Sequence, residues 1–502
     1  MKKKIYTLTS AIILAAGMSA CEEKLDLAPV SEVGSNGFYK NTADFEKAVT
    51  GVYSQLRGYP MVHFDLSEVR SDNIYAPGTS GIRDYNLVNN FNRTLATNAQ
   101  MSRAWNSNYN GIMRANTVIE KLSADAVPDE ALRTRFEAEA KFLRAMYYFD
   151  LVRWFGRVPL FDRSLSPLEA LEVPRSPVED VYNLILADLQ FAVENLPESY
   201  GADNVGRATS HAARGILARV YLTRSGPELH PDGPTLGTDE YTQALQLLNE
   251  IINSGRFAML SDYDRIFAYD NENNSEIVFD IQYRSGGQGL GGEYVQGHYS
   301  EPYARAVGIP FAGGTPPDGP KTPSDGLLAS FGEGDLRVAA SIQQGYTDQN
   351  GNPSSESFIN KYLDLNHLGV DRFDFELNFP VIRYTDVLMM KAEALLKTGG
   401  GQAEVDEIVN AVRTRAGLEP VANVTYEELM EERRKEFVGE GLRWHDLVRS
   451  GLVLDVMNAW IAEEDADEQK MAQNVVNFDI IYAIPQNQLD VKTGLYDQNP
   501  GY

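Results

Sequence analysis

Apolar residues at helical spacing recur along most of this 502-residue chain, and no other feature limits its fold as strongly. One such stripe contains Phe45, Val49, Val52 and Leu56. Residues three and four positions apart lie on one face of a helix, so each stripe predicts an amphipathic helix with a buried side. Further helices are predicted at residues 102–122, 134–155, 177–196, 212–223, 241–253, 383–396, 403–415 and 425–449. The sequence therefore predicts a mostly α-helical protein.

Four of the predicted helices form two pairs. Helices 212–223 and 241–253 carry small residues that let two helices approach closely, and the pair is similar to a tetratricopeptide-type hairpin with a longer loop. Helices 383–396 and 403–415, joined by three consecutive glycines, form a second such pair. Two degenerate pairs far apart do not predict a regular solenoid, but they do predict helical hairpins packed on one another.

The pattern changes in the middle of the chain. Residues 277–283 alternate between apolar and polar side chains, which predicts a strand, and residues 481–485 predict another short strand. Loops rich in Gly, Pro and Ser fill residues 285–324, and loops of that length inside a compact domain are usually functional. The glycine-rich run 286–292 does not lead from a strand into a helix, so we interpret it as a flexible loop and not as a nucleotide-binding loop.

The N-terminus has the pattern of an export signal. Three lysines precede a mostly apolar, uncharged run at residues 5–18, and small residues follow directly before Cys21. This arrangement resembles a bacterial lipobox, so we expect a signal peptide at 1–20, lipid on Cys21 and a tether at 21–37. Cys21 is the only cysteine, which excludes disulfides and cysteine-based metal sites. The apolar run is too short to span a bilayer, so we expect the mature protein to be tethered to the membrane.

Charge and motif content exclude several classes of function. The chain has 71 acidic and 45 basic residues, for a net charge of −26. Nucleic acids and anionic lipid surfaces need a basic patch, so we expect neither as a partner. The six histidines show no HExxH-type spacing, and no P-loop or calcium-binding loop is present. We therefore expect no metal and no cofactor.

Several longer segments have a specific pattern. They are LDLAP (25–29), FLRAMYYFDLV (142–152), GRAT (206–209), IRYTDVLMMKAEA (382–394), RRKEF (433–437), EGLRW (440–444), PQNQL (485–489) and NPGY (499–502). Together with the lipobox, these segments resemble the SusD/RagB family of Bacteroidetes outer-membrane lipoproteins. The resemblance extends over nearly the whole mature chain.

The resemblance implies a fold, a location and a partner. The family's fold is a tetratricopeptide-like scaffold of about eight helices in four pairs, with an irregular, loop-rich part and a few short strands. We expect one such domain at 38–502, with hairpins mainly at 38–257 and 380–450 and a ligand-binding insertion at 258–379. Family members lack catalytic activity and face the cell exterior. They act as lids over SusC-like TonB-dependent transporters, and the genes of glycan-capturing members lie in polysaccharide utilisation loci.

Two loop segments supply candidate ligand-binding residues. The apolar face of a sugar ring stacks on aromatic side chains, while its hydroxyls need amide, carboxylate or guanidinium partners. In the family, the loop before the helix that begins near Ser102 contributes to binding. Both segments lack tryptophan, which starch-binding members use, so starch is in doubt. The candidates are Asp72, Asn73, Tyr75, Arg83, Tyr85 and Phe91 in the first segment, and Tyr294, His298 and Tyr299 in the central insertion.

Three functions remain open from the sequence. The first is capture of an oligosaccharide, and the second is RagB-like capture of a peptide, in which acidic loops would favour basic peptides and salt would weaken binding. The third is a secreted hydrolase, which needs two carboxylates about 5–10 Å apart. Acidic residues and His445 do crowd residues 432–446. However, Arg433 with Glu436, and Glu440 with Arg443, have the spacing of ion pairs on a helix surface, so we interpret this cluster as structural.

Overall fold

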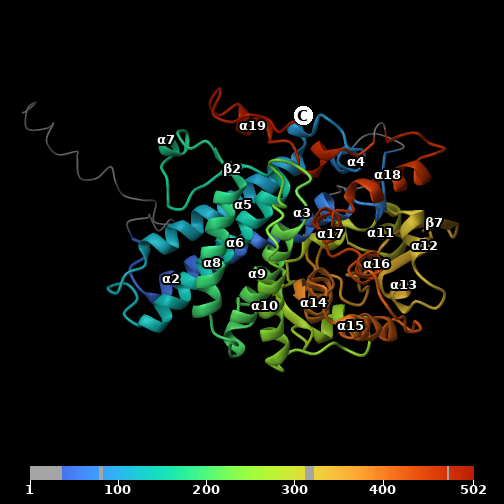
Figure 1. Ribbon diagram of the computed structural model, residues 1–502, viewed down its shortest axis with the longest axis horizontal. Helices are drawn as coiled ribbons and strands as arrows, with labels where there is room; N and C mark the ends of the chain where they lie inside the picture. Colours follow the sequence, from blue (N-terminus) through green and yellow to red (C-terminus); the bar gives the residue numbers. More distant parts are fainter. Residues whose placement is uncertain (1–36, 79–82, 311–320, 472–473) are drawn as a thin grey trace, which may run out of the picture.

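The computed structural model describes residues 37–78, 83–310, 321–471 and 474–502, and helices dominate this part of the chain (Figure 1). The predicted signal peptide, Cys21 and almost all of the predicted tether lie outside the described residues. None of the helices in the described ranges is long and apolar enough to cross a membrane.

Eight long helices form the scaffold, and each packs against the next in chain order. Figure 1 shows them running from α2 on the left to α15 at the lower right. The four pairs are α2 (Thr42–Tyr53) with α5 (Ala99–Lys121), α6 (Glu130–Phe155) with α8 (Val178–Asn195), α9 (Ser210–Ser225) with α10 (Tyr241–Asn253), and α14 (Tyr384–Thr398) with α15 (Gln402–Arg415). The predicted mostly helical, tetratricopeptide-like fold is confirmed.

Local signals explain why these helices begin and end where they do. The side chains of Asn41, Asp129 and Thr209 accept hydrogen bonds from the first-turn backbone amides of α2, α6 and α9. Such caps satisfy N–H groups that have no partner inside the helix. Helix α14 ends at Gly399, whose φ of 71° lies in the left-handed region that glycine adopts without strain.

Helix α6 is the centre of the core. It packs against α2, α5, α8 and α9, and nearly all of its residues from Phe136 onward are buried. The Tyr147 hydroxyl donates to the Val52 carbonyl oxygen at 2.7 Å and so ties α6 to α2. Tyr148 and Trp154 are also buried, as their place in the apolar helix predicted.

Shorter elements surround the scaffold, and most of those on the right of Figure 1 belong to the central insertion or the C-terminal part. The shorter helices are α3 (Tyr59–His63), α4 (Asp84–Asn89), α7 (Pro167–Ala170), α11 (Glu301–Val307), α12 (Asp325–Ser330), α13 (Leu336–Ser341), α16 (Tyr426–Glu436), α17 (Arg443–Ser450), α18 (Val453–Glu464) and α19 (Gln486–Leu489). Four antiparallel strand pairs are described: β1 (Ile74–Tyr75) with β5 (Thr322–Pro323), β2 (Val158–Pro159) with β3 (Arg175–Ser176), β4 (Ile277–Ile281) with β8 (Phe379–Arg383), and β6 (Ile342–Thr347) with β7 (Pro353–Ile359).

The structure corrects two of the sequence predictions. The helix expected at 425–449 is two helices, α16 and α17, because Gly439 and Gly441 adopt φ values of 81° and 75° that end one helix and redirect the chain. The strand expected at 481–485 is irregular. There, the Tyr482 amide donates to the Trp154 carbonyl oxygen and the Asn499 side chain donates to the Tyr482 carbonyl oxygen, so these groups have partners without a strand ladder.

The close contact between α5 and α6 depends on Gly111. A Cβ atom at this position would overlap the ring of Tyr147, whose hydroxyl is already held by Val52. We expect Gly111→Ala to lower the free energy of unfolding by about 1–2 kcal/mol, because overpacking outweighs the gain in helix propensity. Gly58→Ala is the matched control, since its φ is −83° and no atom lies within 4 Å of the added Cβ. Denaturant unfolding measures both, and equal stability of the two variants would contradict the argument.

Candidate functional site

The charged residues at 432–446 form ion pairs, but with partners other than those predicted. Arg433 contacts Asp386 at 2.8 Å and Asp446 at 2.9 Å, and Arg443 contacts Asp72 at 2.8 Å. The predicted surface pairs of Arg433 with Glu436 and of Arg443 with Glu440 were therefore wrong. The physical reason is that these residues lie in the interior and not on a helix surface, so carboxylates from distant segments meet their side chains.

Arg383 is the centre of the largest part of this buried network. Its guanidinium lies 2.6 Å from Glu276, 3.1 Å from Glu436 and 2.9 Å from Glu440, and Lys361 shares Glu440 at 2.8 Å. Burial alone would raise the pKa of Glu276 and of Glu440, but the Arg383 guanidinium and a second cation beside each carboxyl outweigh it and lower both pKa values. This arrangement gives the acidic cluster a structural role.

The structure brings the two predicted loop segments together. Strand β1 pairs with β5, the Ser324 amide donates to the Asn73 carbonyl oxygen at 2.9 Å, and the Ser324 hydroxyl donates to the Asp72 carbonyl oxygen at 2.5 Å. Burial alone would raise the pKa of the Asp72 carboxyl, but Arg434 and Arg443 outweigh it and hold that pKa at about 2. The first segment is therefore fixed to both the insertion and α16–α17.

Most of the predicted ligand-binding residues lie inside the protein in this structure. The ring of Phe91 lies 3.8 Å from the Arg70 guanidinium, and the Tyr294 hydroxyl donates to the Leu377 carbonyl oxygen. The His298 ring packs 4.1 Å from Phe64, and burial lowers the pKa of His298 to about 3. The buried candidates are Asp72, Asn73, Tyr85, Phe91, Tyr294, His298 and Tyr299.

Two predicted residues, Tyr75 and Arg83, lie nearer the surface, and we call their surroundings the loop edge. Tyr75 is half-buried; its ring lies edge-on to Trp460 at 6.3 Å, and its hydroxyl donates to Asp465 at 2.7 Å. Arg83 is exposed and directly precedes α4. Trp460 was not among the predicted site residues. The apolar spacing of residues 453–461 is a helical signal from which α18 could have been predicted.

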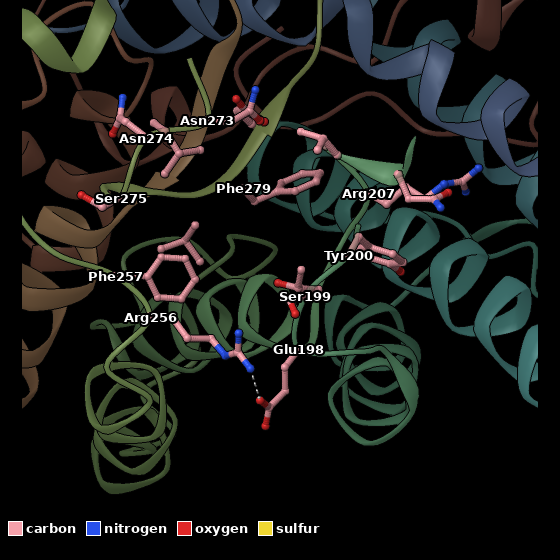
Figure 2. A pocket seen from close by; sticks show the side chains of 17 residues that line it. Glu198, Ser199, Tyr200, Arg207, Arg256, Phe257, Asn273, Asn274, Ser275 and Phe279 are labelled. Carbon is pink, nitrogen blue, oxygen red and sulfur yellow. Dashed lines mark hydrogen bonds and ion pairs between the residues drawn. The ribbon is translucent and has the colours of Figure 1, made fainter. Parts of the chain in front are cut away.

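A separate groove, which we call the Gly206 groove, contains two adjoining hollows of about 340 and 400 Å³. Residues 204–207 and Asp280 line both hollows. Figure 2 shows Phe257, Phe279 and Tyr200 around the first hollow. The shape depends on Gly206, because its φ is 85° and a Cβ atom there would overlap the Gln282 side chain.

Arginines in the first hollow are paired with carboxylates. Arg256 contacts Glu198 at 2.9 Å and so connects the segments that follow α8 and α10 (Figure 2). Arg207 contacts Glu46 at 2.6 Å and Glu139 at 2.8 Å. The lining of the first hollow is therefore close to neutral at these positions.

Asp280 is the buried carboxyl group of the groove. Its Oδ1 atom accepts a hydrogen bond from the Gln282 side chain at 2.5 Å. Burial raises the pKa of Asp280 to about 6, although Gln282 and the nearby Asn378 amide act in the opposite direction. The Asp280 Oδ2 atom is buried without a hydrogen bond of normal geometry to any described residue.

Comparisons with known proteins give a consistent result. Residues 25–222 match the family model described as "Starch-binding associating with outer membrane", and residues 336–502 match that of the SusD family. A SusD-like protein of Bacteroides ovatus is 28% identical, with 89% of this chain and 82% of the relative covered. The starch-binding protein SusD of Bacteroides thetaiotaomicron is 23% identical, with 100% and 99% covered. The solved structure of a laminarin-binding SusD-like protein has a TM-score of 0.74 and 28% identity, and covers 92% of this chain and 100% of its own.

The buried network predicts that loss of an interior arginine lowers stability much more than loss of a surface arginine does. Arg383→Met leaves Glu276, Glu436 and Glu440 buried with one cation fewer, so we expect the free energy of unfolding to fall by about 3–5 kcal/mol. The control is Arg265→Ala, which removes a solvent-exposed ion pair with Asp270. This variant should change the free energy of unfolding by less than about 1 kcal/mol. Urea unfolding compares the two variants, and a similar loss in both would show that the network does not support the fold.

Proposed function

This chain belongs to the SusD/RagB family, and from that membership we propose that it captures oligosaccharides at the cell surface. The observation that carries the proposal is the likeness to the laminarin-binding SusD-like protein, which extends over 92% of this chain with a TM-score of 0.74. A shared fold alone does not determine function, so the proposal also depends on the residues of the candidate site.

We place the ligand at the loop edge. Tyr75 offers part of an aromatic ring to solvent, with Trp460 against its side, and Arg83 is an exposed arginine. These are the group types that stack on a sugar ring and bind its hydroxyls. The buried candidates, such as Asp72 and Phe91, would then act by holding the loop in position. Binding without turnover is the expected activity, because the acidic cluster at 432–446 is committed to ion pairs.

The proposed cellular setting follows from the N-terminus and the family. The lipobox supports lipid attachment at Cys21, and the description of the matching family model supports association with the outer membrane. Family membership supports a SusC-like TonB-dependent transporter as the partner that receives the oligosaccharide, with this protein on the outer face of the membrane. RagB-like peptide capture is the alternative.

Calorimetric titration tests the proposed ligand and its site. The chain without residues 1–21 retains every described residue and is titrated with neutral and acidic oligosaccharides and with mixed peptides, at low and high salt. We expect saturable, salt-tolerant binding of one glycan class with no product formed. Tyr75→Ala should weaken it about tenfold, because an aromatic contact contributes about 1 kcal/mol or more.

Tyr221→Ala is the matched control for Tyr75→Ala, because it removes another half-buried tyrosine, on α9, away from the loop edge. It should leave the affinity unchanged. Binding of peptides alone, or the appearance of cleaved glycan, would contradict oligosaccharide capture. Unchanged affinity in Tyr75→Ala would contradict the loop edge as its site.

Membrane attachment has its own test. We expect Cys21→Ser to move the full-length protein from the membrane fraction to the soluble fraction of the expressing cells, because the only thiol that can carry lipid is removed. The control is Ser19→Ala, which keeps a small residue before the cysteine. Immunoblots of the two fractions measure the distribution, and membrane retention of Cys21→Ser would contradict lipid anchoring.

A further inference from the structure

We infer that the Gly206 groove is a second saccharide site, which takes a neutral oligosaccharide independently of the loop edge. The ligand class is the one in the proposed function, but the argument here rests on the groove's own residues. The groove shares no lining residue with Tyr75, Arg83, Trp460 or Asp465.

The first argument is shape. The two hollows, of about 340 and 400 Å³, each fall within the range of about 300–1,000 Å³ that is usual for small-molecule sites. Their walls come from the end of α2 and the turn after it, the segment between α8 and α9, the segment after α10, β4, and Leu290 in the glycine-rich run 286–292. Apart from Leu290, these walls belong to the packed scaffold helices, to segments that adjoin them or to the β4–β8 pair, so the first hollow is formed before a ligand arrives.

The second argument is the aromatic lining of the first hollow. Phe257 and Tyr200 are half-buried on opposite sides, and Phe279 lies between them (Figure 2). The Phe257 ring is held by Tyr384, stacked at 6.5 Å, and the Tyr200 hydroxyl donates to the Ala208 carbonyl oxygen at 3.1 Å. Rings fixed in this way can bind the apolar face of a sugar with little loss of side-chain entropy.

The third argument is the polar group at the junction of the hollows. Asp280 is only 4% exposed and lines both hollows, and its carboxyl group interacts with the side chains of Gln282 and Asn378. A carboxyl group at this place makes the junction polar, and accessible amides near it can bind the hydroxyls of a ligand. The exposed amide of Asn273 adds a polar group at the rim of the first hollow (Figure 2).

The fourth argument is charge. Arg256 and Arg207, the arginines of the first hollow, both lie in ion pairs with glutamates. A phosphorylated or acidic ligand would have to compete with those glutamates, and a neutral sugar would not. The groove therefore favours a neutral oligosaccharide, and its binding should be nearly independent of salt.

The test uses laminarin oligosaccharides and the chain without residues 1–21, with calorimetry to give the number of sites and the affinity of each. We expect two binding events in the unmodified protein. Phe257→Ala removes one aromatic wall and Asn273→Gly removes the rim amide, and each should weaken one event about tenfold while leaving the other unchanged. Glycine adopts the φ of 53° at position 273 without strain, so we expect Asn273→Gly to fold. This variant therefore tests the groove even if Phe257→Ala does not fold.

Asn423→Gly is the matched control, because this exposed asparagine also has a positive φ, 58°, and does not line the groove. It should change neither event. One event that responds only to Tyr75→Ala would overturn the second site and leave the proposed function intact. One event that responds only to the groove variants would support the groove and overturn the loop edge. If laminarin does not bind, the same titrations use the other oligosaccharides of the panel, and an absence of binding of all of them to the folded protein would overturn both.

Discussion

The contact of Arg383 with three buried glutamates is the interaction on which the arrangement of the binding regions depends. Burying charges costs free energy that only close, complementary partners recover, so these groups hold one specific geometry. Glu276 immediately precedes β4 and Arg383 ends β8, while Glu436 and Glu440 lie at and after the end of α16. The network therefore fixes the β4–β8 pair, and Asp280 with it, against the C-terminal helices.

A second set of buried charges fixes the other binding region. Asp72 is held by Arg443 and Arg434, and Arg434 also donates to the Asn73 side chain. Strand β1 follows directly and pairs with β5. The segment that leads to Tyr75 is therefore irregular in secondary structure but rigidly attached to α16 and α17. Both proposed sites thus depend on charges that α16 and α17 bury, although neither site uses those charges to contact a ligand.

The helices could be predicted from the sequence, whereas the site could not. Periodicity, as in the stripe from Phe45 to Leu56, is local information, and α10 has the predicted bounds. Partner choice is not local: Arg443 had a well-spaced partner in Glu440, yet pairs with Asp72, 371 residues away. Phe91 and Tyr294 are residue types that often bind sugars. They lie in irregular segments, however, and such segments have no periodicity that would show which side chains are buried. The Gly206 groove combines segments distant in sequence, and the GRAT segment (206–209) does not by itself reveal the hollow that Phe257 and β4 complete.

The two proposed sites together would have an effect on binding that neither site has alone. An open surface site leaves many sugar hydroxyls in water, and its affinity is modest because lost freedom offsets much of the contact energy. A polymer long enough to reach both sites would make its second contact intramolecular, which raises avidity without strengthening either site. Short oligosaccharides gain nothing from this effect. A rigid frame with two modest sites would therefore retain long chains better than short ones, which agrees with the proposed capture of oligosaccharides at the cell surface.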